Sequence, residues 1–308
     1  FSGTSLKTSS DFSDKFKIDV VMYPLVAENP ADLENNRDFV EQYHDRIKIG
    51  GYKMFLDGSP QGKTAWMTEP YEGEEDYRGY PIYDDEAVKG YVDAAIKADV
   101  QLLTHCNGDA ASDQLIRSYK AALEDSDNPN KNNLRPVMIH CQTVRNDQLD
   151  KMKEMEMIPS IFVPHTYYWG DVHLKNFGEE RGNRISPSKS AFDRGLMVNF
   201  HQDSPIVDPD MLHTIWSAVN RITRNGVHIG PEERVSVYDA MKAVTINAAY
   251  AYFEEDRKGS IKEGKLADFV ILDENPLKVD QMDIKDIKVL ETIKEGETIY
   301  QAEAVSVK

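Results

Sequence analysis

The sequence predicts an α/β fold in which about six strand–helix units build a parallel sheet. Three short apolar segments carry this prediction, because each ends in residues able to bind a metal: 101–105 in His105, 136–140 in His140, and 196–203 in His201 and Asp203. Segments with helical spacing of apolar residues separate these strands. A closed (β/α) barrel needs eight units, so either the sheet is open or about two units are absent from the start of the chain.

The first third of the chain has the pattern of two strands and two helices. Strands are predicted over 16–23 and 49–56, and helices over 31–46 and 84–98. Residues 59–83 show no periodicity and many turn formers. A loop of this length inside a compact domain is usually functional or mobile.

The rest of the chain alternates between helices and strands and then changes character. Helices are predicted over 110–124, 146–157, 186–194, 210–224 and 235–253, with a strand over 158–163 and an aromatic loop over 166–173. The last part predicts a small β unit, with a turn-rich hairpin over 259–265, a strand over 267–272 and two more strands within 285–301.

Composition excludes several classes of partner. The 308 residues are enough for a large core or two domains, and the net charge of −17 argues against nucleic acid, because a phosphate-binding surface needs excess Lys and Arg. No apolar run reaches about 18 residues, so we expect no transmembrane helix and no membrane partner. The two cysteines, Cys106 and Cys141, are interpreted as free thiols. The compartment stays open, with the cytoplasm favoured.

The strand ends are the candidate metal site. His201 and Asp203 point the same way if they lie in a strand, because residues two apart share a face. A carboxylate at the C-terminal end of a buried strand is where (β/α) barrels place catalytic groups. Asp203 alone is equally consistent with a cap on the following segment, but the repeated pattern at His105 and His140 favours a shared site. Imidazole and carboxylate suit Zn²⁺, and equally Mn²⁺, Fe²⁺ or Co²⁺.

Six motifs in order give the chain a family resemblance: 52–59, 105–109, 139–142, 165–171, 202–205 and 259–268. They resemble the C-terminal part of a metal-dependent amidohydrolase, in the subgroup that includes N-substituted formamide deformylase and the YtcJ-like proteins. The resemblance implies a partial (β/α)8 TIM barrel holding strands three to eight. It implies a lead-in over 1–15, the incomplete barrel over 16–257, and part of the family's β-sandwich domain over 258–308.

The resemblance also implies roles for the strand-end residues. Lys53, often carbamylated in the family, would bind metal with His105, His140 and Asp203, and Asp203 would be the catalytic proton acceptor. The alternative for Lys53 is an ordinary barrel-interior lysine paired with an acid. Family members carry a His-X-His pair on strand one, and this sequence has none. We therefore expect the chain to be a fragment of a longer protein.

Further polar and aromatic residues lie near the predicted strand ends. Besides His201, the candidates for substrate binding or an extra metal contact are His165, which precedes the aromatic loop, and Trp169, Asp171 and His173 within it. The alternative is a packed loop whose Tyr167, Tyr168 and Trp169 cover the barrel mouth. Asp57 and Asp109 either orient metal ligands or cap turns. His44, His213 and His228 lie away from strand ends and are interpreted as structural.

The resemblance implies a hydrolase that cleaves a carbon–nitrogen bond of a non-peptide amide through a metal-activated water. The cofactor would be a divalent metal, with zinc favoured, and this chain alone would bind at most one ion weakly. A non-catalytic or regulatory remnant, or a deaminase or lactonase, stays open as an alternative. The expected partners are a small amide-type substrate and either the missing N-terminal part or a second copy of the chain.

Overall fold

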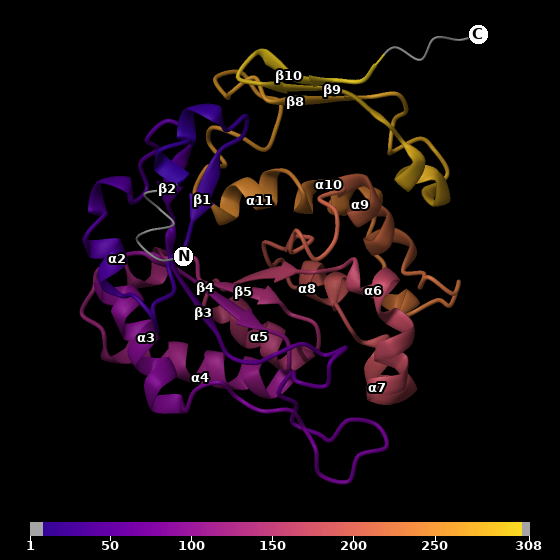
Figure 1. Ribbon diagram of the computed structural model, residues 1–308. Coiled ribbons are helices and arrows are strands. Elements are labelled where there is room, and N and C mark those ends of the chain that lie inside the picture. Colours follow the sequence, from indigo (N-terminus) through magenta and orange to yellow (C-terminus); the bar gives the residue numbers. More distant parts are fainter. Residues whose placement is uncertain (1–8, 304–308) are drawn as a thin grey trace.

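Five parallel strands form the centre of the computed structural model, which describes residues 9–303. They are hydrogen-bonded in chain order: β3 (Gly51–Phe55), β4 (Gln101–Cys106), β5 (Val137–His140), β6 (Ile158–Ile161) and β7 (Asn199–Phe200). The first helices cover the outer side of this sheet (Figure 1): α3 (Asp85–Lys97), α4 (Asp109–Asp125) and α5 (Asn146–Glu154). The fold is a partial (β/α)8 barrel, as predicted. Residues 1–8 of the expected lead-in and 304–308 of the expected C-terminal unit lie outside the described residues.

A sixth parallel segment runs beside the first strand of the sheet. β1 (Val20–Met22) pairs in parallel with β2 (Ile47–Ile49), and the chain then continues along β3. There the Lys53 N–H donates to the Pro24 carbonyl at 2.9 Å. The predicted six parallel strands are thus five regular strands plus this shorter segment. The expected strand over 16–23 was too long at its start, and the one over 49–56 begins earlier and breaks at Gly50.

Three helices and a second sheet follow β7. The helices are α9 (Met211–Asn220), α10 (Val237–Ala243) and α11 (Ile246–Ala251), and the sheet is antiparallel, with strands β8 (Phe269–Leu272), β9 (Val289–Lys294) and β10 (Glu297–Gln301). In Figure 1 the helices lie between the parallel sheet and this second sheet. The predicted C-terminal β unit is confirmed. None of the described helices is long and apolar enough to span a bilayer.

Several predicted elements were wrong in detail. The helix expected over 31–46 shrinks to α2 (Ala31–Glu34) and a 3-10 turn, η2 (Arg37–Phe39). Asn35 and Asn36 explain the break, because asparagine competes with helical hydrogen bonds. The helix expected over 235–253 is interrupted between α10 and α11 at Val244 and Thr245, which are β-branched. Residues 259–265 form turns and not a hairpin.

The segment expected to be an aromatic loop is helical. It forms α6 (His165–Tyr168) and the start of α7 (Gly170–Asn183), and α8 (Ser188–Asp193) follows. Aromatic residues have only modest helix propensity, so the helical conformation of this segment depends on side-chain packing. Phe162 provides that packing, with its ring centroid 4.4 Å from the ring of His165 and 6.1 Å from that of Trp169.

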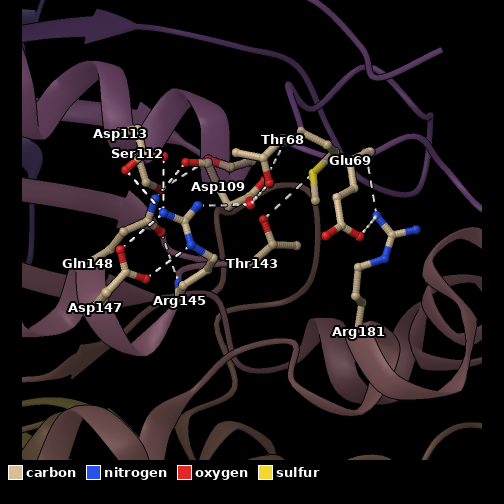
Figure 2. A network of polar contacts seen from close by, with 12 residues as sticks. Thr68, Glu69, Asp109, Ser112, Asp113, Thr143, Arg145, Asp147, Gln148 and Arg181 are labelled. Atoms are coloured by element: carbon tan, nitrogen blue, oxygen red, sulfur yellow. Dashed lines mark hydrogen bonds and ion pairs between the residues drawn. The ribbon is translucent and has the colours of Figure 1, made fainter. Parts of the chain in front are cut away.

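The long irregular segment over 59–83 is held by specific contacts. Figure 2 shows Arg145 among three carboxylates, with nitrogen–oxygen distances of 3.0 Å to Asp109, 3.1 Å to Asp113 and 3.0 Å to Asp147. Asp109 in turn accepts a hydrogen bond from the Thr68 N–H at 2.8 Å. The segment is therefore attached to the outer helices near its middle.

A group of partly buried charges joins the start of the chain to the C-terminal sheet. Asp19 lies 2.5 Å from Lys258, 3.2 Å from Lys294 of β9 and 3.0 Å from Arg46. Asp19, Arg46 and Lys258 border a cavity of about 480 Å³, which is also lined by Asp14. The cationic partners lower the pKa of Asp19 to about 2, although burial opposes them.

We expect Asp19→Asn to lower the free energy of unfolding at pH 7 by about 2 kcal/mol, since one pKa unit corresponds to about 1.4 kcal/mol. The pKa of Asp19 is lower in the folded than in the unfolded chain, so its stabilisation is complete above about pH 4. It is lost as the pH falls through about 2. Urea unfolding across this range measures the effect, and Asp14→Asn is the control. A pH-independent difference would contradict the assignment.

Candidate metal centre

Three histidines from three strands meet at the carboxyl ends of the sheet. His105 is the penultimate residue of β4, His140 ends β5 and His201 directly follows β7. His140 Nε2 lies 3.0 Å from His105 Nδ1, and His201 Nε2 lies 3.1 Å from His140 Nδ1. The structure thus brings together three residues singled out at the strand ends, in a continuous row.

The backbone of His140 explains how its ring enters this row. His140 is paired in register with Cys106, whose side chain is fully buried in the outer core. Regular alternation of side chains along β5 would therefore place the His140 ring on the same side of the sheet as Cys106. The left-handed backbone at His140 (φ 79°) and Cys141 (φ 50°) breaks this alternation and lets the ring enter the row. A left-handed backbone is costly in residues with a Cβ and is typical of functional positions.

The two ends of the row are fixed by groups of the chain. His105 Nε2 lies 3.0 Å from the Gly58 carbonyl oxygen. Asn107 Nδ2 lies 3.1 Å from the same ring nitrogen, so His105 Nε2 either donates to the Gly58 oxygen or accepts from Asn107. At the other end, Ser160 Oγ lies 3.0 Å from His201 Nδ1. Asn107 supports the first end by donating from Nδ2 to the same Gly58 oxygen at 2.8 Å.

Burial keeps all three rings uncharged. It lowers the pKa of His105 to about 4 and that of His201 to about 3, and neighbouring Lys53 adds to the effect in both. The pKa of His140 is also held well below its usual value by burial and by the adjacent histidines. Neutral imidazole is the form that binds metals, because the lone pair must be available.

Lys53 and Asp203 lie beside the row and interact through space. Burial lowers the pKa of Lys53 to about 8, and the charge of Asp203 opposes this. The Lys53 Nζ lies 5.0 Å from the centroid of the Phe55 ring. Asp203 is in the exposed turn after β7 with φ 54°, and reduced solvation of its carboxyl raises its pKa. No direct ion pair joins the two among the described residues.

The facing nitrogens of His105 and His140 fit a divalent metal as two of its ligands. Two nitrogens bound to tetrahedral Zn²⁺ at about 2.0–2.1 Å lie roughly 3.3 Å apart, and these two are 3.0 Å apart. Within residues 9–303, no set of three or more His, Cys, Asp or Glu side chains is arranged to hold a metal. Asp203 is therefore not placed as a third ligand beside His105 and His140, and the remaining ligand positions need Lys53, a movement of Asp203 or a group from outside the described residues.

Asp57 and Asp109 have different tasks. Asp57 is 2% exposed and accepts hydrogen bonds from the N–H groups of Trp66, Asn107 and Gly108 at 3.0, 3.0 and 2.7 Å. Its carboxylate is also 3.6 Å from His105 Nε2, so it both caps the turn and approaches a proposed ligand. Burial raises the pKa of Asp57 to about 7 against these three donors. Asp109 lies in the Arg145 network of Figure 2.

The residues of α6 and α7 form a second polar pair behind Phe162. His165 Nδ1 lies 3.1 Å from His173 Nε2, and His173 Nδ1 is buried without a hydrogen-bond partner in the described structure. Trp169 packs against His165 with ring centroids 4.5 Å apart, and Asp171 accepts a hydrogen bond from Thr223 at 3.0 Å. Both earlier interpretations, substrate contact and packed cover, remain compatible with this arrangement.

The other histidines lie outside the row, as interpreted from the sequence. His44 stacks on Phe39 with ring centroids 4.2 Å apart, and His213 packs between Tyr167 and Trp216. His228 is exposed and contacts Arg234.

Sequence reasoning missed the groups that hold the row in place. Ser160 and Phe162 lie inside an apolar segment, where only the single hydroxyl group of Ser160 departs from the pattern of a buried strand. Asn107 and Gly58 look like ordinary turn residues. The sequence showed the three histidines of the row at their strand ends, but nothing in it showed the groups that hold them.

A family model described as an amidohydrolase family matches residues 13–300. The chain belongs to this family. The chain is 26% identical over 261 residues to YtcJ of Bacillus subtilis (strain 168), covering 83% of this chain and 48% of that protein. It is 25% identical over 256 residues to the N-substituted formamide deformylase of Arthrobacter pascens, covering 83% and 46%. The amidohydrolase chain thus spans less than half the length of these relatives.

Solved structures agree with this family and fold. An uncharacterized metal-dependent hydrolase from Pyrococcus furiosus superimposes with a TM-score of 0.75 at 26% identity, covering 89% of this chain and 55% of that one. A second, from Pyrococcus horikoshii OT3, has a TM-score of 0.77 at 24% identity, covering 90% and 55%, and supports the fold. The resemblance inferred from the six motifs is confirmed.

We expect Asp57→Asn to destabilise the amidohydrolase chain by about 1–3 kcal/mol, the cost of one buried donor left without an acceptor. One carboxamide oxygen cannot accept from all three N–H groups that Asp57 binds. Thermal and urea unfolding measure the loss. Asp113→Asn, which changes a more exposed carboxylate of α4, is the comparison, and equal effects would contradict the role of Asp57.

Proposed function

We propose that the chain is part of a metal-dependent hydrolase that cleaves a carbon–nitrogen bond of a small, non-peptide amide with water. The supporting observation is the pair of neutral imidazoles, His105 and His140, whose nitrogens face each other at the carboxyl ends of the strands. Barrel enzymes place their catalytic groups at this end. N-substituted formamide deformylase, by its name, acts on an amide, which favours that substrate class over a lactone.

The proposed mechanism assigns one task to each residue. A metal held by His105 and His140 would lower the pKa of bound water to about 7 and polarise the substrate carbonyl. Asp203, beside the row, would accept the proton of the attacking water and pass it to the leaving nitrogen. Its raised pKa favours accepting that proton.

Lys53 would complete the ligand set as a carbamate. Carbamate formation needs the neutral amine, and a pKa of about 8 makes that form more abundant than in an ordinary lysine. In this chain alone we expect Lys53 to stay largely uncarbamylated, because the metals that a carbamate bridges are what stabilise it.

We expect this chain alone to bind at most one divalent ion, weakly, since only two nitrogen ligands face one another and structural or catalytic zinc uses at least three protein ligands. Equilibrium dialysis against Zn²⁺ with elemental analysis counts the ions. His140→Phe should remove the bound ion, while His44→Phe, a ring outside the histidine row, should not. Two tightly held ions per chain would contradict this expectation, and no measurable binding would contradict the assignment of His105 and His140 as ligands.

In an intact protein that contains this chain, we expect Asp203→Asn to lower kcat by about 10²–10⁴-fold, the usual contribution of a positioned proton acceptor. Stability should change little, because Asp203 is exposed. Steady-state kinetics on a small formamide or amide measures the loss. Asp208→Asn, an exposed carboxylate of the same turn, is the control, and retained turnover in Asp203→Asn would remove Asp203 from proton transfer.

A further inference from the structure

His201 has both ring nitrogens occupied by groups of the chain. Its Nε2 lies 3.1 Å from His140 Nδ1, and its Nδ1 lies 3.0 Å from Ser160 Oγ. A ring bound on both sides is poorly placed to contact substrate, which was the role expected for it from the sequence. It is well placed to orient a neighbour.

We propose that His201, held by Ser160, is a positioning residue that fixes the ring orientation and the tautomer of His140, so that His140 Nε2 is presented to a metal. This inference rests on the proposed function, because it concerns how one proposed ligand is held. Histidine ligands commonly use their second nitrogen to bind a carboxylate, a carbonyl or water. Here a second histidine, itself held by a hydroxyl, takes that place.

Packing restricts the three groups to this arrangement. Ser160 is 8% exposed and His140 is 5% exposed, so neither side chain has free space to choose other partners. Phe162 lies on the other side, with its ring centroid 5.3 Å from that of His201 and 6.1 Å from that of His140. The Phe162 face offers no competing hydrogen bond to either ring.

The protons of the row have two consistent placements in the metal-free chain, because His105 Nε2 lies 3.0 Å from the Gly58 carbonyl oxygen and 3.1 Å from Asn107 Nδ2. In the first, His105 Nε2 donates to Gly58, His140 and His201 each donate from Nε2 to the next ring, and the Ser160 hydroxyl donates to His201 Nδ1. In the second, Asn107 donates to His105 Nε2, and every donor and acceptor along the row is reversed. In both placements His140 and His201 carry their protons on the same-named nitrogen, so their tautomers are coupled.

Metal binding between His105 and His140 requires one defined proton pattern. His105 must offer the lone pair of Nδ1, and His140 must free Nε2 and carry its proton on Nδ1. That proton is then donated to His201 Nε2, so His201 must carry its own proton on Nδ1 and donate it to Ser160 Oγ. Both rings stay neutral and no proton leaves the row. The Ser160 hydroxyl suits both states because it can donate or accept.

Zn²⁺ affinity at one fixed pH, measured by competition with a chelating dye, tests this role. We expect His201→Phe to weaken binding by about 10–100-fold, the usual effect of losing a partner of a ligand histidine. His201→Gln should bind within a few-fold of wild type, because its amide oxygen can replace Nε2 as the acceptor. His44→Phe is the matched ring replacement outside the row and should bind as wild type. Equal affinity of His201→Phe and wild type would overturn the proposal.

Ser160→Ala provides a second variant in case His201→Phe does not fold, and thermal unfolding of every variant checks this. It removes only the far partner, so we expect a smaller loss of affinity than from His201→Phe. Ser160→Ala with unchanged affinity, alongside an unfolded His201→Phe, would also overturn the positioning role.

Nitrogen-15 spectra of the histidine rings separate this inference from the proposed function. We expect His140 and His201 to carry their protons on the same-named nitrogen in the metal-free chain, and both on Nδ1 after Zn²⁺ is added. If wild type binds no Zn²⁺, the proposed function fails for this chain, and the metal-free spectrum decides the inference alone. Protons on differently named nitrogens of His140 and His201, in either state, would overturn it.

Discussion

The buried carboxylate of Asp57 is the interaction on which the site most depends. It binds the N–H groups of Trp66, Asn107 and Gly108, and so joins the long irregular segment to the turn after β4. Gly108 is needed there because a Cβ would lie 1.9 Å from the Trp66 carbonyl oxygen. The same turn presents Asn107, which with the Gly58 carbonyl sets the ring of His105. One acid therefore fixes a loop, a turn and a metal-ligand candidate together.

The second attachment of the irregular segment serves a different purpose. Arg145 and Asp109 hold Thr68 from outside the barrel (Figure 2), while Tyr71 packs against Phe177 of α7 with ring centroids 5.3 Å apart. A segment held at several points along its length cannot swing freely as a unit. It forms a fixed wall beside the strand ends, which suits a site whose geometry must be maintained before substrate arrives.

Sequence patterns predicted the strand ends well, because an apolar run that stops at a polar residue marks both a strand and its functional end. His105 and His140 were found this way, and the structure places their nitrogens face to face. The pattern could not show the left-handed backbone of His140, which reverses the alternation that the prediction assumed. Nor could it show Ser160, whose role depends on a neighbouring strand that lies 41 residues away in the chain. Tertiary packing likewise turned the expected aromatic loop into helix.

The incomplete barrel separates the parts that stabilise it from the parts proposed to act. α11 closes the amino ends of the strands, where Gln101 donates to the Ala251 carbonyl at 2.9 Å and Val137 and Ile158 pack on Ala251. Just after α11, Glu254 forms an ion pair with Lys48 of β2 at 2.6 Å, which connects the last barrel helix to the first strands. These contacts stabilise the amino ends of the strands, and the neutral histidine row lies at the carboxyl ends. Because the stabilising contacts at the amino ends are separate from the histidine row at the carboxyl ends, a loss of stability at the amino ends need not change the geometry of the row. Replacing Asp19 should therefore change the free energy of unfolding while leaving the tautomers of the row as they are.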